Sequence, residues 1–181
     1  YAEKHYGEGK GTGEKILNPV TQIYLEEGAV FTLDTAQIGG VDSTVRKTEV
    51  HMEADARLYV MEKLMTHDNQ TAVSDMTVEM NGAGSSAQIV SRSVAKGHSI
   101  QTFHPIAIGN ALCHAHVQCD SIIMDKAQIS SIPEINARDI DAQIIHEAAI
   151  GRINNEQILK LRTFGMTEEE AEAVIIEDFL A

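Results

Sequence analysis

The sequence predicts an all-β body that forms a β-solenoid and is followed by two short helices. The first observation is composition: the 181 residues include 20 Ile, 12 Val and 12 Thr but only 9 Leu, and β-branched residues favour strands. The second is a phrase that returns about every 28 residues. The third is a change, near the end of the chain, from alternating hydrophobicity to helical spacing.

The repeated phrase is apolar, any residue, apolar, two turn-like residues and then small residues. It begins at Ile23, Val50, Val78 and Ile106, at intervals of 27, 28 and 28 residues. A weaker copy at Ile122 follows after only 16 residues, so we expect the regular spacing to break there. Repeated short strands fit a solenoid or a sandwich, and the near-constant period favours the solenoid, in which each coil stacks on the last.

Alternating runs fill the intervals between the phrases and predict strands. No segment of ten residues with a helical period separates them, which disfavours βαβ units. We expect residues 1–153 to form the β core, with residues 1–15 irregular. The clearest runs are 57–62, 71–78, 87–94 and 99–103.

Residues 154–181 predict a helical segment. Asn154 or Asn155 can cap a first helix that runs to Phe164. Thr167-Glu-Glu-Glu170 predicts a capping box for a second helix. The apolar faces of these helices either pack on the open end of the β body, hiding its edge, or dock a partner. The residues expected to contact a partner are Ile158, Leu161, Phe164, Val174 and Phe179.

The charge and cysteine content exclude several classes of partner. Against 27 Asp and Glu there are only 14 Lys and Arg, which gives a net charge of −13. Such a chain repels phosphate backbones and anionic lipids, so we expect no nucleic-acid partner and no membrane surface. No apolar run approaches the length of a membrane helix. Two Cys cannot form a disulfide framework, which favours a reducing compartment.

The densest group of potential metal ligands is Cys113, His114, His116 and Cys119. On a strand the two thiols would lie about 20 Å apart, too far to share one zinc ion. We expect both to face inward, Cys113 as a core residue and Cys119 as the more accessible thiol, because it lies where the spacing breaks. His114 and His116 face outward, either as solvated residues or as a pair able to chelate a transition metal.

A second candidate is the pair His146-Glu147, which interrupts small and apolar residues just before the helices. Alternation along a strand places the two side chains on opposite faces. A buried carboxylate there is costly unless it is paired or binds a metal; the alternative is an ion pair at the rim. No Walker-type phosphate loop is present, so we expect no nucleotide hydrolysis by this chain.

Several motifs together resemble one protein family. They are Gly97-His-Ser-Ile-Gln-Thr, Val117-Gln-Cys-Asp-Ser121, Ser131-Ile-Pro-Glu134 and His146-Glu-Ala-Ala-Ile-Gly-Arg-Ile153, with Arg162-Thr-Phe-Gly-Met and Glu170-Ala-Glu-Ala in the helices. Their order and spacing over residues 81–179 resemble the core of the SufB/SufD family, the scaffold proteins of the SUF system of iron–sulfur cluster assembly. Residues 1–80 resemble it through the repeat alone.

The resemblance implies a right-handed parallel β-helix with a C-terminal helical segment. It implies a cytoplasmic, non-enzymatic scaffold that assembles and transfers a transient iron–sulfur cluster. The implied partners are a SufC-type ABC ATPase on the helical end, a second copy or a SufB/SufD paralogue that dimerises through the β-helix, and a cysteine desulfurase or other sulfur donor. Cys119, His146 and Glu147 are the implied cluster ligands; no motif supports a flavin.

The chain departs from the family in two respects. Glu147 is SufB-like, whereas residues 149–153 are closer to SufD, which indicates a compact SufBD protein acting as a homodimer. No Cys precedes Cys113, so the sulfur-receiving Cys of SufB members has no counterpart here. Two other functions stay open: a purely structural partner of an ATPase, and a β-helix carbohydrate-active enzyme, which the absence of Trp disfavours.

Overall fold

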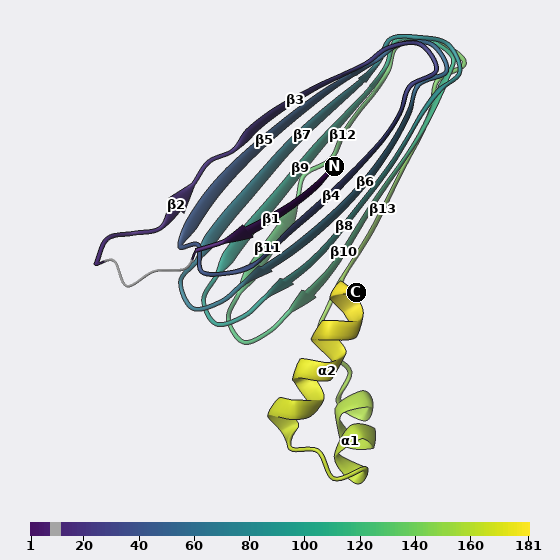
Figure 1. Ribbon diagram of the computed structural model, residues 1–181. Helices are drawn as coiled ribbons and strands as arrows, with labels where there is room; N and C mark the ends of the chain where they lie inside the picture. Colours follow the sequence, from purple (N-terminus) through teal and green to yellow (C-terminus); the bar gives the residue numbers. More distant parts are fainter. Residues whose placement is uncertain (8–11) are drawn as a thin grey trace.

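The computed structural model describes residues 1–7 and 12–181, which form a parallel β-solenoid followed by two helices (Figure 1). The parallel β-helix with a helical end is therefore confirmed. Successive long strands alternate between two sheets, and all the strand pairs are parallel. Side chains on the facing sides of the two sheets form the core, because alternate residues of each strand point inward.

Sheet A has the strand order β1-β4-β6-β8-β10-β13. Its strands are β1 (Ala2–Tyr6), β4 (Val30–Gly39), β6 (Arg57–Thr66), β8 (Ser85–Ala95), β10 (Cys113–Ile123) and β13 (Gln143–Gly151). Sheet B has the order β11-β9-β7-β5-β2, with β12 also beside β9 and β3 beside β5. Its strands are β2 (Ile16–Leu17), β3 (Val20–Leu25), β5 (Ser43–Met52), β7 (Thr71–Met80), β9 (Ile100–Gly109), β11 (Gln128–Ser131) and β12 (Glu134–Ala137).

Strand β1 corrects the expectation that residues 1–15 are irregular. Ala2–Tyr6 pairs with β4 along the edge of sheet A. Its half-buried side chains, Glu3 and His5, are polar, so no hydrophobic alternation reveals the strand in the sequence. Residues 8–11 of the same segment lie outside the described residues.

The repeated phrase corresponds to strand register in sheet B. Ile23 lies opposite Val50, and Val50 opposite Val78, as the phrase predicts. Val78 lies opposite Ala107, one residue after the predicted Ile106. The predicted fourth phrase is therefore shifted by one position.

The spacing does not break at Ile122, and that expectation is wrong. β11 and β12 continue the ladder of sheet B, with Gln128 opposite Ile100 and Ile135 opposite Ala107. The strand is interrupted between β11 and β12, where Pro133 has no N–H to offer the ladder. This interruption hides the last coil from a search for the repeated phrase.

The two helices begin as predicted. α1 (Asn155–Thr163) is capped by Asn154, and α2 (Glu168–Leu180) has the predicted capping box of Thr167 and Glu170. Leu180 of α2 packs in a cluster with Val94 and Met124, which places α2 on the outer face of sheet A. α1 buries no residue. Within the described parts of the chain, no helix has the length and apolar character needed to cross a membrane.

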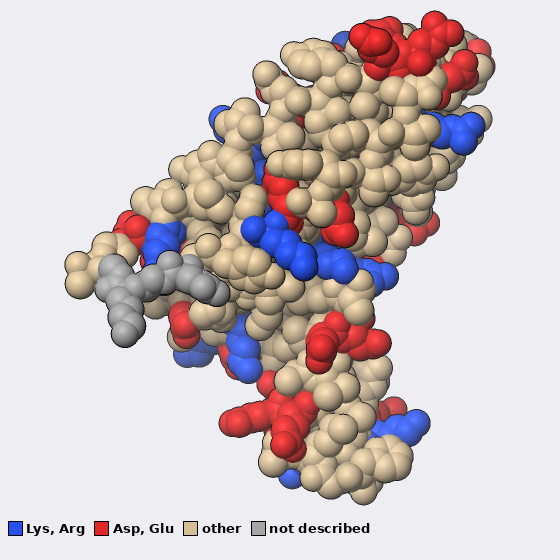
Figure 2. Space-filling view, viewed as in Figure 1, with Lys and Arg blue, Asp and Glu red and all other residues tan. Residues whose placement is uncertain are grey.

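Acidic and basic side chains occupy different parts of the surface (Figure 2). Acidic side chains gather at the end of the solenoid that holds the turns after β3 and β5, where the sequence has Glu26, Glu27, Glu53 and Asp55. A band of basic side chains crosses the middle of the visible face. The net negative charge is therefore not spread evenly over the protein.

Candidate functional site

A row of inward-facing polar residues crosses sheet A and ends at Cys119. Strand register places Thr35, Glu62, Ser91 and Cys119 opposite one another on β4, β6, β8 and β10. All four are buried. The row two positions earlier on the same strands is entirely apolar; it contains Leu33, Val60, Ile89 and Val117. The interior around Cys119 thus differs from the rest of the core.

Glu62 places a negative charge inside this row. Ser74 and Ser91 donate hydrogen bonds to its two carboxylate oxygens, at 2.7 and 3.0 Å. An Nη atom of Arg46 lies 3.9 Å from the carboxylate, and both side chains are buried. This pairing offsets the cost of desolvating two charges. Sequence reasoning missed Glu62, although the inward phase of Leu58 and Val60 on the same strand could have identified it.

Arg46 is also held from the other side by His5. An Nη atom of Arg46 lies 2.9 Å from Nδ1 of His5. Burial, and then the charge of Arg46, lower the pKa of His5. The imidazole is therefore neutral at neutral pH, and Nδ1 can accept a hydrogen bond from the guanidinium.

Cys119 and His146 meet across β10 and β13. Sγ of Cys119 lies 3.3 Å from Nε2 of His146. Register sets Val117 opposite His146 and Cys119 opposite Ala148, so His146 is an inward-facing diagonal neighbour of the thiol. Sequence reasoning placed both residues in the candidate site through the family resemblance, and the strand pairing provides their contact.

Burial determines the ionisation of this pair. Burial is the largest cause that raises the pKa of the Cys119 thiol to about 11; the neighbouring hydroxyl of Ser131 opposes the rise, and the charges of Glu62 and Asp120 add to it. Burial also lowers the pKa of His146. At neutral pH the pair is therefore a protonated thiol beside a neutral imidazole. A neutral imidazole can bind a metal ion without first losing a proton.

The thiol and imidazole form a hydrogen bond, and their separation is also close to that of two ligands on one metal ion. A tetrahedral ion with ordinary metal–sulfur and metal–nitrogen bonds holds its S and N ligands about 3.6 Å apart, close to the 3.3 Å observed. Binding displaces the thiol proton, because the thiolate is the ligand. Cys119 and His146 can therefore serve as two ligands of a soft or borderline metal.

Glu147 lies on the opposite face of sheet A. It is opposite Gln118 in the register, and its Oε2 lies 3.5 Å from Nε2 of His116. Its side chain is 65% exposed. The structure thus brings two of the three expected ligands together and sets the third apart. Among the described residues, no three His, Cys, Asp or Glu side chains are arranged to hold one metal ion.

The expectation that Cys119 is the more accessible thiol is wrong. Cys119 is 3% exposed and Cys113 is 5% exposed, and both are free thiols. Their surroundings distinguish them instead, because Cys119 lines a small internal cavity with polar residues that include Glu62 and Ser91. Oγ of Ser131, which lines the same cavity, is buried without a hydrogen-bond partner. Cys113 belongs to the apolar core, as expected.

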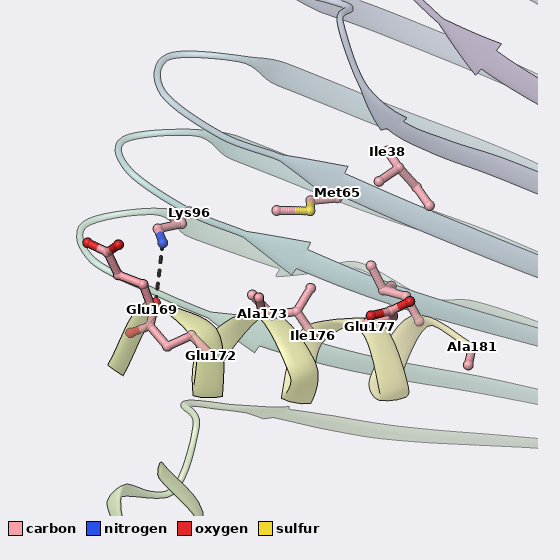
Figure 3. A pocket seen from close by; sticks show the side chains of 10 residues that line it. Ile38, Met65, Lys96, Glu169, Glu172, Ala173, Ile176, Glu177 and Ala181 are labelled. Carbon is pink, nitrogen blue, oxygen red and sulfur yellow. Dashed lines mark hydrogen bonds and ion pairs between the residues drawn. The ribbon is translucent and has the colours of Figure 1, made fainter. Parts of the chain in front are cut away.

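A groove of about 550 Å³ lies between α2 and sheet A (Figure 3). Ile38 and Met65 of the sheet face Ala173 and Ile176 of α2 across it. Its rim is charged: Lys96 and Glu172 form an ion pair at 3.3 Å, and Glu169 and Glu177 also line the groove. The helical end therefore presents an apolar hollow bordered mainly by acids.

The residues expected to contact a partner differ in exposure. Phe164 is 74% exposed and Val174 is 42% exposed. Ile158 and Leu161 are half-buried. Phe179 packs against the cluster that contains Val94 and Met124. Phe164 and Val174 are therefore the most exposed of the five side chains, whereas Phe179 helps to attach α2 to the solenoid.

Comparison with known proteins identifies the family. Residues 15–179 match the SufBD core domain of SUF system FeS cluster assembly. The chain belongs to the SufBD family. An iron-sulfur cluster assembly SufBD family protein of Methanocaldococcus jannaschii is 29% identical over 99% of the chain and 57% of its own length. One from Pyrococcus horikoshii is 30% identical over 99% of the chain and 55% of its own length.

The SufBD match includes both features described above. It begins before β2 and ends within α2, so it includes the Cys119–His146 contact and most of the helical end. A further SufBD relative, from Archaeoglobus fulgidus, is 28% identical over 91% of the chain and 45% of its own length. This SufBD chain thus spans about half the length of the curated relatives it matches.

Proposed function

We propose that this SufBD chain is a cytoplasmic, non-enzymatic scaffold that assembles and transfers a transient iron–sulfur cluster, with Cys119 and His146 as its first ligands. The single observation that carries the proposal is the 3.3 Å contact between Sγ and Nε2 in a family of assembly proteins. Thiolate and imidazole both bind iron. Two such ligands hold a cluster less firmly than four thiolates, as transfer to a recipient requires.

Glu147 is the third proposed ligand, but it must approach from the other face of the sheet. β13 is the last strand of sheet A, and among the described residues it pairs only with β10. The Glu147 carboxylate can therefore reach the inner side only around the free edge of β13. Sulfide ions or residues of a second chain are the other candidates for the open positions on iron.

The same edge supports a dimer through the β-helix. An unpaired strand edge is a template for pairing with another chain. Ile145 and Ile150 on β13 are 48% and 44% exposed, which gives that edge apolar side chains to bury. A second copy of this chain or a SufB/SufD paralogue would add its own residues beside Cys119 and His146.

The helical end is the proposed docking surface for a SufC-type ABC ATPase. α1 buries none of its residues. Two large apolar side chains at this helix are exposed, Leu159 to 63% and Phe164 to 74%. Exposed apolar side chains that do not support the fold are typical of interaction sites. A cysteine desulfurase or another sulfur donor would supply the sulfide.

Anaerobic reconstitution with ferrous iron and sulfide tests the cluster site. We expect the wild-type protein to bind a cluster and Cys119→Ser to lose most bound iron and sulfide, with His146→Ala reduced as well. Cys113→Ser is the matched control, because it alters an equally buried thiol in apolar surroundings, and it should behave as wild type. A wild-type protein that binds no cluster, or a Cys119→Ser variant that equals Cys113→Ser, would refute the proposal.

A further inference from the structure

The groove between α2 and sheet A is formed by one face of the helix and the outer face of the sheet. From α2 it is lined at spacings of three and four residues, which is one stripe of a helix, by Glu169, Ala173, Ile176 and Leu180. Leu180 is 7% exposed and packs with Val94, whereas Ile176 is half-buried and Ala173 is exposed. The helix is therefore packed closely on the sheet near Leu180, and the groove opens toward Glu169.

The open part of the groove exposes apolar side chains on both of its walls. Ile38 of β4 is 43% exposed, and together with Met65 of β6 it faces Ala173 and Ile176 of α2 (Figure 3). Ala173 adds only a methyl group to its wall, and a volume of about 550 Å³ stays open between helix and sheet. An apolar hollow with a polar rim marks an interaction site. The groove is therefore a binding surface rather than a completed part of the core.

The rim of the groove carries negative charge that no basic side chain offsets. Glu172 pairs with Lys96 at 3.3 Å. Glu169 and Glu177 are exposed, and none of the ion pairs among the described residues includes either of them. An occupant with basic side chains at the rim therefore gains favourable charge pairing, whereas an acidic occupant is repelled.

The walls of the groove favour a helix over an extended segment. β4 lies between β1 and β6, and β6 lies between β4 and β8, so neither strand of the wall has a free edge to which an extended segment could pair. The other wall is α2, whose backbone hydrogen bonds are made within the helix. A helical occupant satisfies its own backbone N–H and C=O groups and needs only side-chain contacts, which is what these walls offer.

We propose that this groove binds a basic amphipathic helix of a partner protein. Apolar residues at positions i, i+4 and i+7 of that helix would enter between Met65 and Ile176, while Lys or Arg residues beside them would pair with Glu169 and Glu177. A second copy of this chain is a poorer occupant, because both copies carry a net charge of −13 and their acidic rims repel each other.

This surface goes beyond the docking surface proposed for the ATPase, which consists of exposed apolar residues at α1. Among the described residues, those that line the groove come from sheet A, the turn after β8, α2 and Ala181, and none comes from α1. The groove and the end of α1 can therefore be tested separately. Binding in the groove does not depend on whether α1 contacts an ATPase.

The probe is a synthetic helical peptide of about 18 residues, long enough to form a helix, with Leu along one face and Lys at the other positions. Fluorescence anisotropy measures its binding to the full chain, and we expect one peptide per chain. A peptide of the same composition with its Leu residues scattered around the helix should bind at least about tenfold more weakly, because it cannot place its apolar residues in the groove together. A peptide with Glu in place of Lys should also bind at least about tenfold more weakly.

Two substitutions in the groove should weaken binding of the ordered Leu–Lys peptide. Glu177→Lys should do so at least about fivefold, because attraction becomes repulsion; Asp178→Lys makes the same kind of charge change at an exposed residue that does not line the groove, and should cost no more than about twofold. Ala173→Phe should fill the groove and weaken binding at least about tenfold without lowering the melting temperature. Gln157→Phe adds the same side chain to an exposed position of α1 and should leave binding unchanged.

Three results would overturn the proposal. Equal binding of the ordered and scattered Leu–Lys peptides, or equal weakening by Glu177→Lys and Asp178→Lys, would show that the acidic chain attracts any basic peptide. Full binding by Ala173→Phe would place the peptide outside the groove. A wild-type protein that is dimeric and becomes monomeric with Ala173→Phe would assign the groove to a second copy. Association with the ATPase is a separate measurement, so its absence would refute docking at α1 without changing the peptide result.

Discussion

The thiol of Cys119 lies 3.3 Å from the imidazole of His146, although 27 residues separate them along the chain. The solenoid produces this contact because its coils stack in register: Val117 is opposite His146, and Cys119 is two positions further on the same inner face. The pair therefore depends on the length of one coil. An insertion or deletion in the chain between β10 and β13 that changed their register by one residue would turn His146 outward.

The buried pair should make stability depend on pH in both directions. The pKa of His146 is lowered from 6.5 by burial, so below about pH 6.5 the unfolded chain binds the proton first and stability falls as pH falls. The Cys119 pKa is raised from 9.0 to about 11, so above pH 9 the unfolded chain loses the proton first and stability falls as pH rises. The alkaline loss should approach about 2 kcal/mol near pH 11.

Urea unfolding of the metal-free protein between pH 5 and about pH 11 measures this profile. Cys119→Ser should flatten part of the alkaline side and leave the part due to Cys113, whose pKa burial also raises. His146→Gln should flatten part of the acid side and leave the part due to His5, whose pKa burial also lowers. A Cys119→Ser variant that keeps the full alkaline loss would contradict the assignment to this thiol.

Much of the fold follows from local pattern, whereas the site depends on register between coils. Alternation and the period identify the strands from β6 to β9, and Thr167 with Glu170 locates the start of α2. β1 is missed because its strand carries polar residues on its inner side. Local pattern separates His146 from Glu147, since neighbouring residues of a strand face opposite ways.

The burial and polar surroundings of Cys119 could not be predicted from the sequence pattern. The interruption at Pro133 hid the continuation of the coils, and this led to the expectation that Cys119 lies at a break and is accessible. The structure buries it to 3% exposure. The polar surroundings of the thiol come from Glu62 and Ser91, one residue from each of two earlier coils. Only the pairing of strands brings such residues into one row.

Replacing Glu62 should destabilise the fold strongly. Glu62→Ala leaves the buried Arg46 without a counter-ion and two serine hydroxyls without an acceptor. Loss of one partner of a buried charge pair costs about 3–5 kcal/mol. Glu62→Gln keeps an acceptor but loses the charge, so a smaller loss is expected. Chemical denaturation measures both free energies of unfolding.

Glu49 provides the control for Glu62. It lies exposed on the outer face of sheet B, where its carboxylate accepts a hydrogen bond of 2.9 Å from the Gln22 side chain. Glu49→Ala should change stability by less than about 0.5 kcal/mol. Similar unfolding free energies for Glu62→Ala and Glu49→Ala would show that the buried pair does not stabilise the solenoid.

The tight stacking of turns predicts a large difference between two glycine substitutions. A Cβ at Gly82 would overlap the backbone N and Cα of Ala54 in the preceding coil, whereas a Cβ at Gly151 would have no atom within 4 Å. Gly82→Ala should therefore cost at least about 2 kcal/mol, because backbone cannot move aside as a flexible side chain does. Gly151→Ala should be neutral or slightly stabilising. Thermal unfolding compares the two, and equal melting temperatures would contradict the stacked turn.

Substitution of Phe164 should weaken partner docking without destabilising the fold. The side chain is 74% exposed, so Phe164→Ser should leave the melting temperature unchanged. The substitution should weaken the association with a SufC-type ATPase by about tenfold, as expected for an aromatic residue central to an interface. Leu180→Ala should show the reverse order of effects, because Leu180 is 7% exposed and packs with Val94; we expect a loss of about 2 kcal/mol or more in stability.

Calorimetric titration of the ATPase with each variant measures the association. Gln157→Ala is the matched control, since it changes an exposed polar residue of the same helix as the docking surface and should alter neither quantity. A Phe164→Ser variant that binds the ATPase with wild-type affinity would exclude this end of α1 from the interface. The groove beside α2 would then be the remaining candidate surface. That groove has its own apolar residues, Met65 and Ile176, so the same titration with Ile176→Ser would then decide between the two surfaces.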